Sequence, residues 1–414
     1  MPYVTSREED RSKYNYFRFS QHEYDSRHRR IRKFMAEQDL ECLLITGQAT
    51  HWDRGWTNIV YVMNWMGTME MPAYCVFPKE GDPVVAALYL NASHADRTAR
   101  ATCGEVRGTV GRGTDTAAVA LERILELGVK KGRIGLVEPD VGVGLPANHL
   151  DFLKRELPEV AFVSVTRDWW LMRVEKSAEE FAVLEQTALW ADAAHAELAK
   201  IIRPGVTERE LFVNVYNTLY SLGADHPSML LLASGPMEED YANFQRNRPV
   251  NRVLRKGDIV VTELGPRHSG SYEAQVGHVF TIGAPSQKYR DAFAAGVEAH
   301  NRMLDVCRVG KNEYDIWEAA RPFREANLDP AEYHTGNWAI VHGMFSVPKD
   351  IRQRIAVDPP EERNPLLPYQ LLTVEVHSAL PNRKGGVFVC KPYIVMPEGP
   401  PKALSQFPLE ITEL

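Results

Sequence analysis

The chain has 414 residues, 44% of them hydrophobic and 25% charged, which is typical of a globular protein with two or three domains. Its formal net charge of -7 argues against a nucleic-acid partner, which would require a basic face. No apolar run approaches the roughly 18 residues that span a bilayer, and the polar residues 1–18 are unlike a signal peptide, so we expect no membrane association. The five cysteines are scattered without paired spacing, which favours a reducing, cytoplasmic location.

The first 170 residues predict an α/β domain. Ser20 can cap a helix over 20–39, in which apolar residues form a rough stripe. Strands are expected at 42–46, 59–62, 73–77, 83–90 and 133–137, and helices at 116–127 and 150–157. Alternating strands and helices of this kind predict a mixed or parallel sheet.

Helix-start signals mark a second domain, which we place at 171–414 after a first domain at 1–170. Ser177 and Glu180 form a capping box before a long amphipathic helix that ends near 202. Thr207 and Glu210 form a second capping box before a helix that reaches 222. Strands are then expected at 259–263, 271–282, 371–377 and 387–395, and helices at 287–306 and 313–327.

A hairpin at 257–280 holds the most informative polar residues. Turn signals at 256–258 and 266–270 bound two extended runs. Glu263 lies in the first run, and Gln275 and His278 lie in the second. Polar side chains in such apolar strands either face water or line a site, and the apolar surroundings favour a site.

This hairpin resembles the first metal-binding hairpin of the pita-bread family, which contains methionine aminopeptidase, prolidase, aminopeptidase P and creatinase. Arg173 to Ser177, followed by the sequence RPGVTEREL at 203–211, also resembles the opening of that family's catalytic domain. The resemblance covers most of 19–407. It implies an α/β N-terminal domain, as in creatinase, and an α+β pita-bread catalytic domain at the C-terminus.

The resemblance also implies five ligand positions, which the family fills with two Asp, one His and two Glu around two metal ions. In this chain they are Glu263, Gln275, His342, Glu375 and Cys390. His342 and Glu375 match the pattern, whereas the other three are changed. Two carboxylates carry too little charge to hold two ions, so we predict no metal cofactor. One divalent ion such as Mn or Zn is the alternative.

Without a metal, converging carboxylates and a histidine would favour a cationic substrate group such as a guanidinium, as the resemblance to creatinase implies. The candidate catalytic residues are Glu263, Glu375, His342, His278 and His377. Each has a structural interpretation too: a buried glutamate can pair with an arginine, and a strand histidine can be part of the core.

Arginine replaces the acid/base histidine that creatinase has just before the hairpin. At that place Arg246 and Arg248 would hold an anionic substrate group. The further candidates for substrate binding are Gln275, Tyr272, Trp338 and Cys390. Cys390 can also be explained as a small buried apolar residue, and Trp338 as a packing residue.

Three functions are compatible with these residues. The leading hypothesis is a creatinase-like, metal-independent hydrolase or lyase that acts on a C–N bond of a small polar metabolite and forms a homodimer. The second is a metallopeptidase of the Xaa-Pro aminopeptidase or dipeptidase type with an altered metal site. The third is a non-catalytic binding module.

Overall fold

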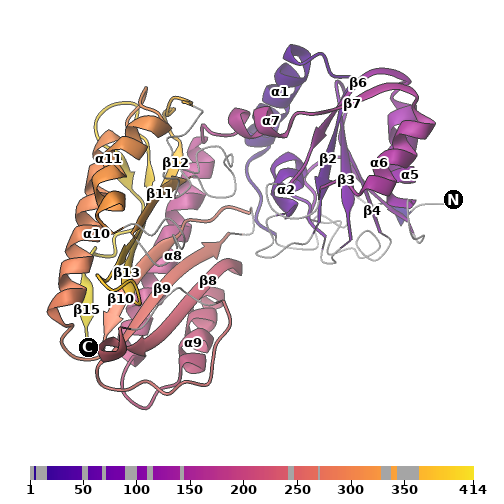
Figure 1. The fold of residues 1–414 in the computed structure, drawn as a ribbon. Coiled ribbons are helices and arrows are strands. Elements are labelled where there is room, and N and C mark those ends of the chain that lie inside the picture. Colours follow the sequence, from indigo (N-terminus) through magenta and orange to yellow (C-terminus); the bar gives the residue numbers. More distant parts are fainter. Residues whose placement is uncertain are drawn as a thin grey trace. The chain divides into compact units, whose positions relative to one another are not determined.

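The computed structural model describes residues 4–5, 16–48, 55–67, 71–88, 100–109, 115–139, 144–240, 247–268, 271–327, 337–342 and 363–414. The chain divides into two compact units at Arg173 and Val174 (Figure 1). Each unit has its own sheet and its own helices.

The first unit has a seven-stranded sheet in the order β1-β5-β4-β3-β2-β6-β7. Its strands are β1 (Val4–Thr5), β2 (Cys42–Gly47), β3 (Ala73–Pro78), β4 (Val84–Leu88), β5 (Glu105–Thr109), β6 (Lys131–Val137) and β7 (Glu159–Ser164). The pairs β2–β6, β4–β5 and β6–β7 are parallel and the others antiparallel. This arrangement confirms the predicted mixed α/β sheet.

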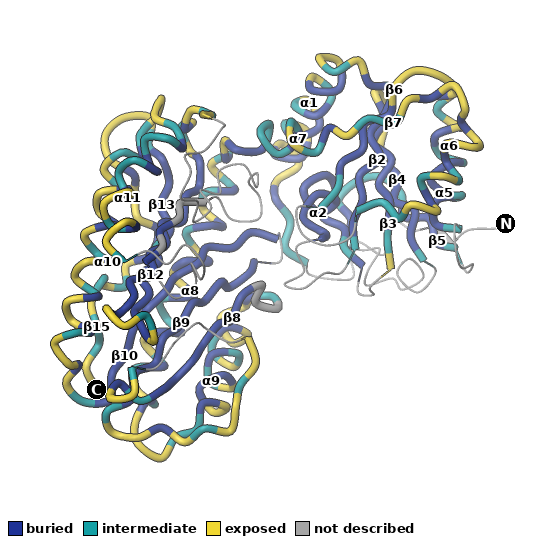
Figure 2. Tube along the Cα trace, in the orientation of Figure 1, coloured by how far each residue is buried: buried dark blue, intermediate teal, exposed yellow. Residues whose placement is uncertain are grey.

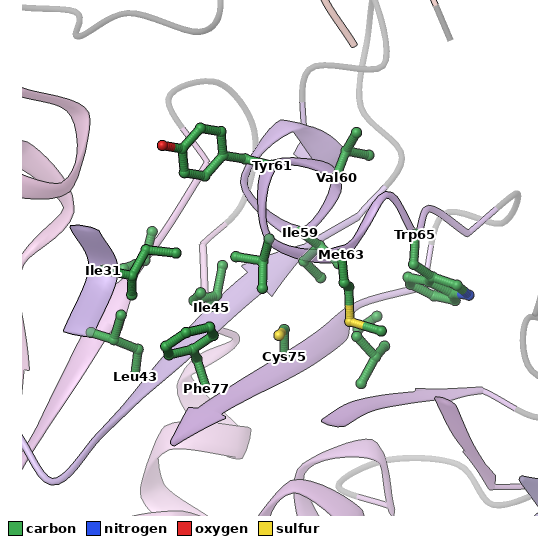
Figure 3. Close-up of a cluster of buried hydrophobic side chains, with 14 of the residues drawn as sticks. Ile31, Leu43, Ile45, Ile59, Val60, Tyr61, Met63, Trp65, Cys75 and Phe77 are labelled. Carbon is green, nitrogen blue, oxygen red and sulfur yellow. The ribbon is translucent and has the colours of Figure 1, made fainter. Parts of the chain in front are cut away.

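Helices cover both faces of this sheet (Figure 1). They are α1 (Gln21–Glu37), α2 (Thr57–Met63), α5 (Asp115–Glu126), α6 (Ala147–Glu156) and α7 (Thr166–Met172). Because side chains alternate along a strand, Leu43 and Ile45 pack under α1 and α2, whereas Cys42 and Leu44 pack under α5 and α6. Figure 3 shows the first of these two cores. Ser20 caps α1 as predicted, since its side chain accepts a hydrogen bond from the Glu23 backbone amide.

The strand expected at 59–62 is wrong, because these residues belong to helix α2. All seven residues of α2 are buried, so the segment shows neither the alternation of a half-buried strand nor the stripe of a surface helix. Its β-branched residues favoured a strand, but tertiary packing overrides that preference. Asn64 ends the helix in the left-handed conformation (φ 58°), which Asn tolerates better than most residues.

The second unit has an eight-stranded sheet whose main path runs β11-β12-β13-β10-β9-β8. Its strands are β8 (Asp225–Pro236), β9 (Asp258–Arg267), β10 (Val276–Thr281), β11 (Trp338–His342), β12 (Leu371–Ala379), β13 (Gly386–Ile394), β14 (Lys402–Ala403) and β15 (Ile411–Glu413). Strand β14 pairs with β13, and β15 pairs in parallel with β10. The antiparallel pairing of β9 with β10 confirms the predicted hairpin.

The helices of this unit lie on one face of the sheet. They are α8 (Ala178–Ile201), α9 (Glu208–Ser221), α10 (Gln287–Val306) and α11 (Glu313–Ala326), with a short 3₁₀ turn at Met237–Glu239. Val260 and Leu264 share a core with α8 and α9, and Gly296 of α10 lies against Val376 and Val389. The register puts all four of these strand residues on the same face, which we call the helix face.

Both predicted capping boxes are present. Ser177 and Glu180 cap α8 reciprocally, and Thr207 and Glu210 do the same for α9. Figure 2 shows that the strands are buried while the helices expose their outer sides. Among the described residues, no helix is both long and apolar enough to cross a membrane.

Candidate functional site

A row of paired residues crosses the face of the second sheet that is turned away from the helices. Glu263 pairs with Gly277, Gly277 with Cys390, and Cys390 with Glu375. Residues directly opposite one another in antiparallel strands project to the same face. Strands β9, β10, β13 and β12 therefore bring Glu263, Cys390 and Glu375 to one surface, which we call the site face.

Gly277 provides room in the middle of this row. A Cβ atom at Gly277 would lie 2.8 Å from both Cys390 Cβ and Phe388 Cδ1, so any other residue would displace them. The Cys390 thiol lies 3.8 Å from the Gln275 carbonyl oxygen and 3.9 Å from Glu375 Oε1. It therefore occupies the space between the hairpin and Glu375.

The charges of the row keep Cys390 protonated. Burial, and then the negative charges of Glu375 and Glu263, raise the pKa of the Cys390 thiol well above its usual value. The thiol is fully buried, and the two carboxylates are 8% and 6% exposed. Cys390 is thus a neutral, weakly donating group at neutral pH, not a thiolate nucleophile, whereas both glutamates contribute negative charge.

Gln275 adds a neutral oxygen donor two residues before Gly277, on the same face. It is 1% exposed, and its Nε2 contacts Met229 Sδ of β8 at 2.7 Å. Its Oε1 is buried and has no hydrogen-bond partner within the described part of the chain. A buried acceptor without a donor is costly unless a ligand or ion satisfies it.

His377 lies on the site face as well, two residues along β12 from Glu375. Its ring packs over Gly386, where a Cβ atom would come within 2.9 Å of Nε2. The backbone of β11 places Trp338 in register with His377 and His342 in register with Thr373. The side chains of Trp338 and His342 lie outside the described part of the structure, as does the whole of Arg246.

His278 points away from these residues. It pairs with Thr262 on the helix face, where its Nε2 lies 2.7 Å from Thr412 Oγ1. Its ring meets those of His195 and Phe407 at centroid distances of 5.7 and 4.5 Å. Burial lowers the pKa of His278 to about 3, so the ring is neutral.

Two further predicted substrate-binding residues have other surroundings. The Tyr272 hydroxyl donates to Glu180, the carboxylate that also caps α8. Arg248 is exposed. The residues that come together on the site face are therefore Glu263, Gln275, Glu375, His377 and Cys390.

Sequence reasoning missed Gly277 and Met229 as parts of this site. Gly277 stands in the middle of an apolar strand, a position that often indicates close approach of another chain segment. Met229 begins the apolar run MLLLA at 229–233, which is a strand signal. The contact between Gln275 and Met229 depends on pairing β8 with β9, which no local motif specifies.

The donor atoms of the row suit a hard divalent cation. Two carboxylates and an amide oxygen are ligands that such ions prefer, whereas a protonated thiol is a poor one. Within the described residues, no group of three or more His, Cys, Asp or Glu side chains is arranged to hold a metal ion. With Glu263 and Glu375 as its only carboxylates, the row carries enough negative charge for one divalent ion but not for two.

Comparison with known proteins assigns both units. Residues 182–396 match the model of metallopeptidase family M24, and residues 27–174 match the creatinase/prolidase N-terminal domain. The chain belongs to metallopeptidase family M24. This confirms the resemblance to the pita-bread family and the fold expected from it: an N-terminal α/β domain before an α+β catalytic-type domain.

The relatives are distant in sequence but close in fold. The chain is 25% identical to a probable dipeptidase PepE of Mycobacterium tuberculosis over 163 residues, which is 39% of this chain and 42% of that protein. It is 23% identical to a creatinase of a Bacillus species over 315 residues, 75% of this chain and 73% of the relative. The crystal structure of an X-Pro aminopeptidase from Thermotoga maritima superposes with a TM-score of 0.75 at 19% identity, covering 94% of this chain and 99% of that one.

The family assignment overturns one expectation from the sequence. We expected no metal cofactor, but the chain belongs to a family of metallopeptidases, and its relatives include Xaa-Pro dipeptidases. Two carboxylates carry too little negative charge for two divalent ions, and we inferred from this that no ion binds. A single divalent ion needs fewer carboxylates. The oxygen donors on the site face fit that alternative.

Proposed function

We propose that the second unit is a hydrolase of C–N bonds in small peptides, of the Xaa-Pro dipeptidase type, that works with one divalent cation. The observation that carries the proposal is the row in which Glu263 and Glu375 flank Cys390 on one face of a family M24 domain. Buried carboxylates so placed stabilise a cation, and a cation relieves the repulsion between them.

Each of these side chains would have a different role. Glu263 and Glu375 hold the cation, and Gln275 Oε1 gains the partner that it lacks in the described structure. A bound divalent ion supplies Lewis-acid polarisation of a carbonyl and lowers the pKa of water. His377, on the same face as Glu375, is placed to exchange protons with the substrate. Cys390 stays protonated and excludes water from the middle of the row.

The test is an assay of purified protein, first stripped of metal with a chelator and then supplied with Mn²⁺, Co²⁺ or Zn²⁺. We expect hydrolysis of one or more Xaa-Pro dipeptides, restored by about one equivalent of ion per chain. Cys42→Ser, which lies in the first unit, is the control that should leave turnover unchanged. Two tightly bound ions per chain, or no ion-dependent turnover with any dipeptide, would contradict the proposal.

A creatinase-type reaction on a guanidinium compound is the second candidate, because the match to creatinase extends over 75% of this chain. Turnover of creatine without turnover of any Xaa-Pro dipeptide would favour it over the dipeptidase. A protein that binds neither ions nor small substrates would be a binding module.

We also propose that the protein forms a homodimer, as the resemblance to the two-domain family members implies. Light scattering at micromolar concentration tests this, and a monomeric mass would contradict it.

A further inference from the structure

The sheet of the second unit consists of two halves that meet at one seam. Strands β8, β9 and β10 carry helices α8 and α9, and strands β11, β12 and β13 carry α10 and α11. Within each half the strands pair over long stretches, for example β12 with β13 from Leu371 to Ala379. Across the seam, β10 and β13 share the single pair Gly277–Cys390 in the described part of the chain.

The two carboxylates of the proposed site lie on opposite sides of this seam. Glu263 belongs to β9 in the first half, and Glu375 belongs to β12 in the second. Any movement of one half against the other therefore changes the distance between them. Cys390, at the seam itself, would be exposed by the same movement.

The C-terminal residues 402–414, which we call the strap, are bound to both halves. On the first half, Asp192 of α8 accepts hydrogen bonds of 2.6 Å from Ser405 Oγ and from the Gln406 backbone amide. On the second half, Lys391 of β13 donates to the Phe407 carbonyl at 3.0 Å. The strap therefore links helix α8 to strand β13.

The end of the strap lies in the sheet itself, along the edge of β10 that β13 occupies at the seam. Strand β15 pairs in parallel with β10, with Val279 opposite Ile411 and Thr281 opposite Glu413. Thr412 Oγ1 lies 2.7 Å from His278 Nε2 on the helix face. The strap therefore holds β10 along the same edge as β13, and the Thr412 side chain also contacts it on the helix face.

We propose that the strap sets the separation of Glu263 and Glu375 by clamping the two sides of the seam together, which makes Asp192 and Thr412 positioning residues for the cation site. The clamping follows from the contacts alone, whereas its effect on a cation rests on the function proposed above. Catalytic and ligand groups tolerate little misplacement, since about 1 Å can cost a factor of roughly 100.

The test uses the full chain with Asp192→Asn and Thr412→Val, singly and together. The first readout is the alkylation rate of Cys390 measured by peptide mass spectrometry, because this buried thiol reacts only when the seam opens. Cys307, buried at the end of α10, reports general loosening of the same unit. Glu197→Gln is the matched control on α8, because Glu197 pairs with Lys200 at 2.5 Å and not with the strap.

In the double variant we expect Cys390 to react about tenfold faster, as local opening becomes more frequent, with the Cys307 rate unchanged. We also expect weaker binding of Mn²⁺ by about tenfold or more, measured by calorimetry. Unchanged Cys390 labelling, or a parallel rise at Cys307, would overturn the clamping role. If the double variant does not fold, Thr412→Val alone, which nearly preserves side-chain volume, gives the same comparison.

The two proposals can fail separately. Faster Cys390 labelling in a protein that binds no cation in any form would leave the clamp standing and remove the proposed function. Cation binding that is tight and identical in all variants would support the function and overturn the positioning role.

Discussion

The two faces of the β9–β10 hairpin carry buried polar residues with opposite roles. On the helix face, Thr262 lies 2.8 Å from His195 Nε2 and donates to the His278 carbonyl, so its hydroxyl is matched inside the core. On the site face, Glu263 lies in a row with Glu375, and Gln275 Oε1 has no partner in the described structure. The Thr262 hydroxyl thus has its partners inside the fold, whereas Gln275 Oε1 has none among the described residues.

This comparison shows that burial of a polar residue in a strand does not indicate function by itself. His278 and Gln275 are both buried, yet His278 has a threonine hydroxyl and aromatic rings as neighbours, whereas Gln275 Oε1 has no partner in the described structure. The informative property is what remains unmatched after folding. Substitutions on the two faces should therefore change different observables.

Glu375→Gln should have the largest effect. We expect at least about 100-fold weaker cation-dependent turnover, because a charged ligand becomes neutral. In the metal-free protein the variant should be as stable as the parent or more stable by about 1 kcal/mol, because functional sites trade stability for activity. Denaturant unfolding in the presence of a chelator measures this. A loss of about 3 to 5 kcal/mol would instead identify Glu375 as half of a buried ion pair.

Gly277→Ala should affect both the packing of the seam and the cation site. The added Cβ would meet Cys390 Cβ and Phe388 Cδ1 at 2.8 Å, so the seam must shift. We expect a loss of roughly 1 to 3 kcal/mol in unfolding free energy together with weaker cation binding. Gly128→Ala serves as the comparison for a glycine with no neighbour near the added atom, although its φ of 74° adds local strain. If Gly277→Ala left the unfolding free energy and the cation affinity unchanged, the seam would be more adaptable than its packing indicates.

Thr262→Val tests the helix face alone. The change keeps the shape of the side chain but leaves His195 Nε2 without its hydroxyl partner. We expect the unfolding free energy to fall by about 1 to 2 kcal/mol while cation affinity stays within the error of calorimetry. If affinity fell as strongly as in Glu375→Gln, the functional division between the two faces would be wrong.

His300→Gln should change the melting temperature least at neutral pH and clearly in acid. Burial lowers the pKa of His300 to about 4, so the folded protein holds this α10 ring neutral beside the Tyr393 hydroxyl of β13. In the unfolded chain this histidine binds a proton below about pH 6.5. The stabilisation that the neutral buried ring gives to the folded state is therefore complete above about pH 6.5 and is lost as the pH falls towards 4. Melting temperature should therefore depend less steeply on pH in this window in the variant. If the melting temperatures of the variant and the parent depended equally on pH, the lowered pKa would not belong to His300.

Much of the fold could be predicted because local signals agree with the final structure. Capping boxes at Ser177 and Thr207 fixed the starts of α8 and α9 to within a residue. The helix expected at 287–306 is α10. Residues 59–62 were wrongly predicted to be a strand. In a fully buried segment every residue is apolar or covered, so the hydrophobic periodicity that distinguishes a strand from a helix is absent.

The site was harder to predict, because a strand's alternation shows which residues share a face but not which face that is. Glu263 and His278 lie on neighbouring strands, and only the register of the hairpin shows that they project to opposite sides. The pairing of Cys390 with Glu375 is local to one hairpin, whereas its pairing with Gly277 joins residues 113 positions apart. No short motif encodes such a contact. The residue roles assigned here, and the cytoplasmic location, remain predictions.

The parallel pairing of β15 with β10 also has a consequence for how the protein is made. His278 and Thr412 are 134 residues apart, and β10 lies in the interior of its sheet. During synthesis the first unit can fold early, because domains generally fold as units from the N-terminus. Strand β10 must wait until residue 412 has emerged before its last partner arrives. Until then its apolar residues are open to wrong partners, so the second unit is the part of the nascent chain most in need of protection from aggregation.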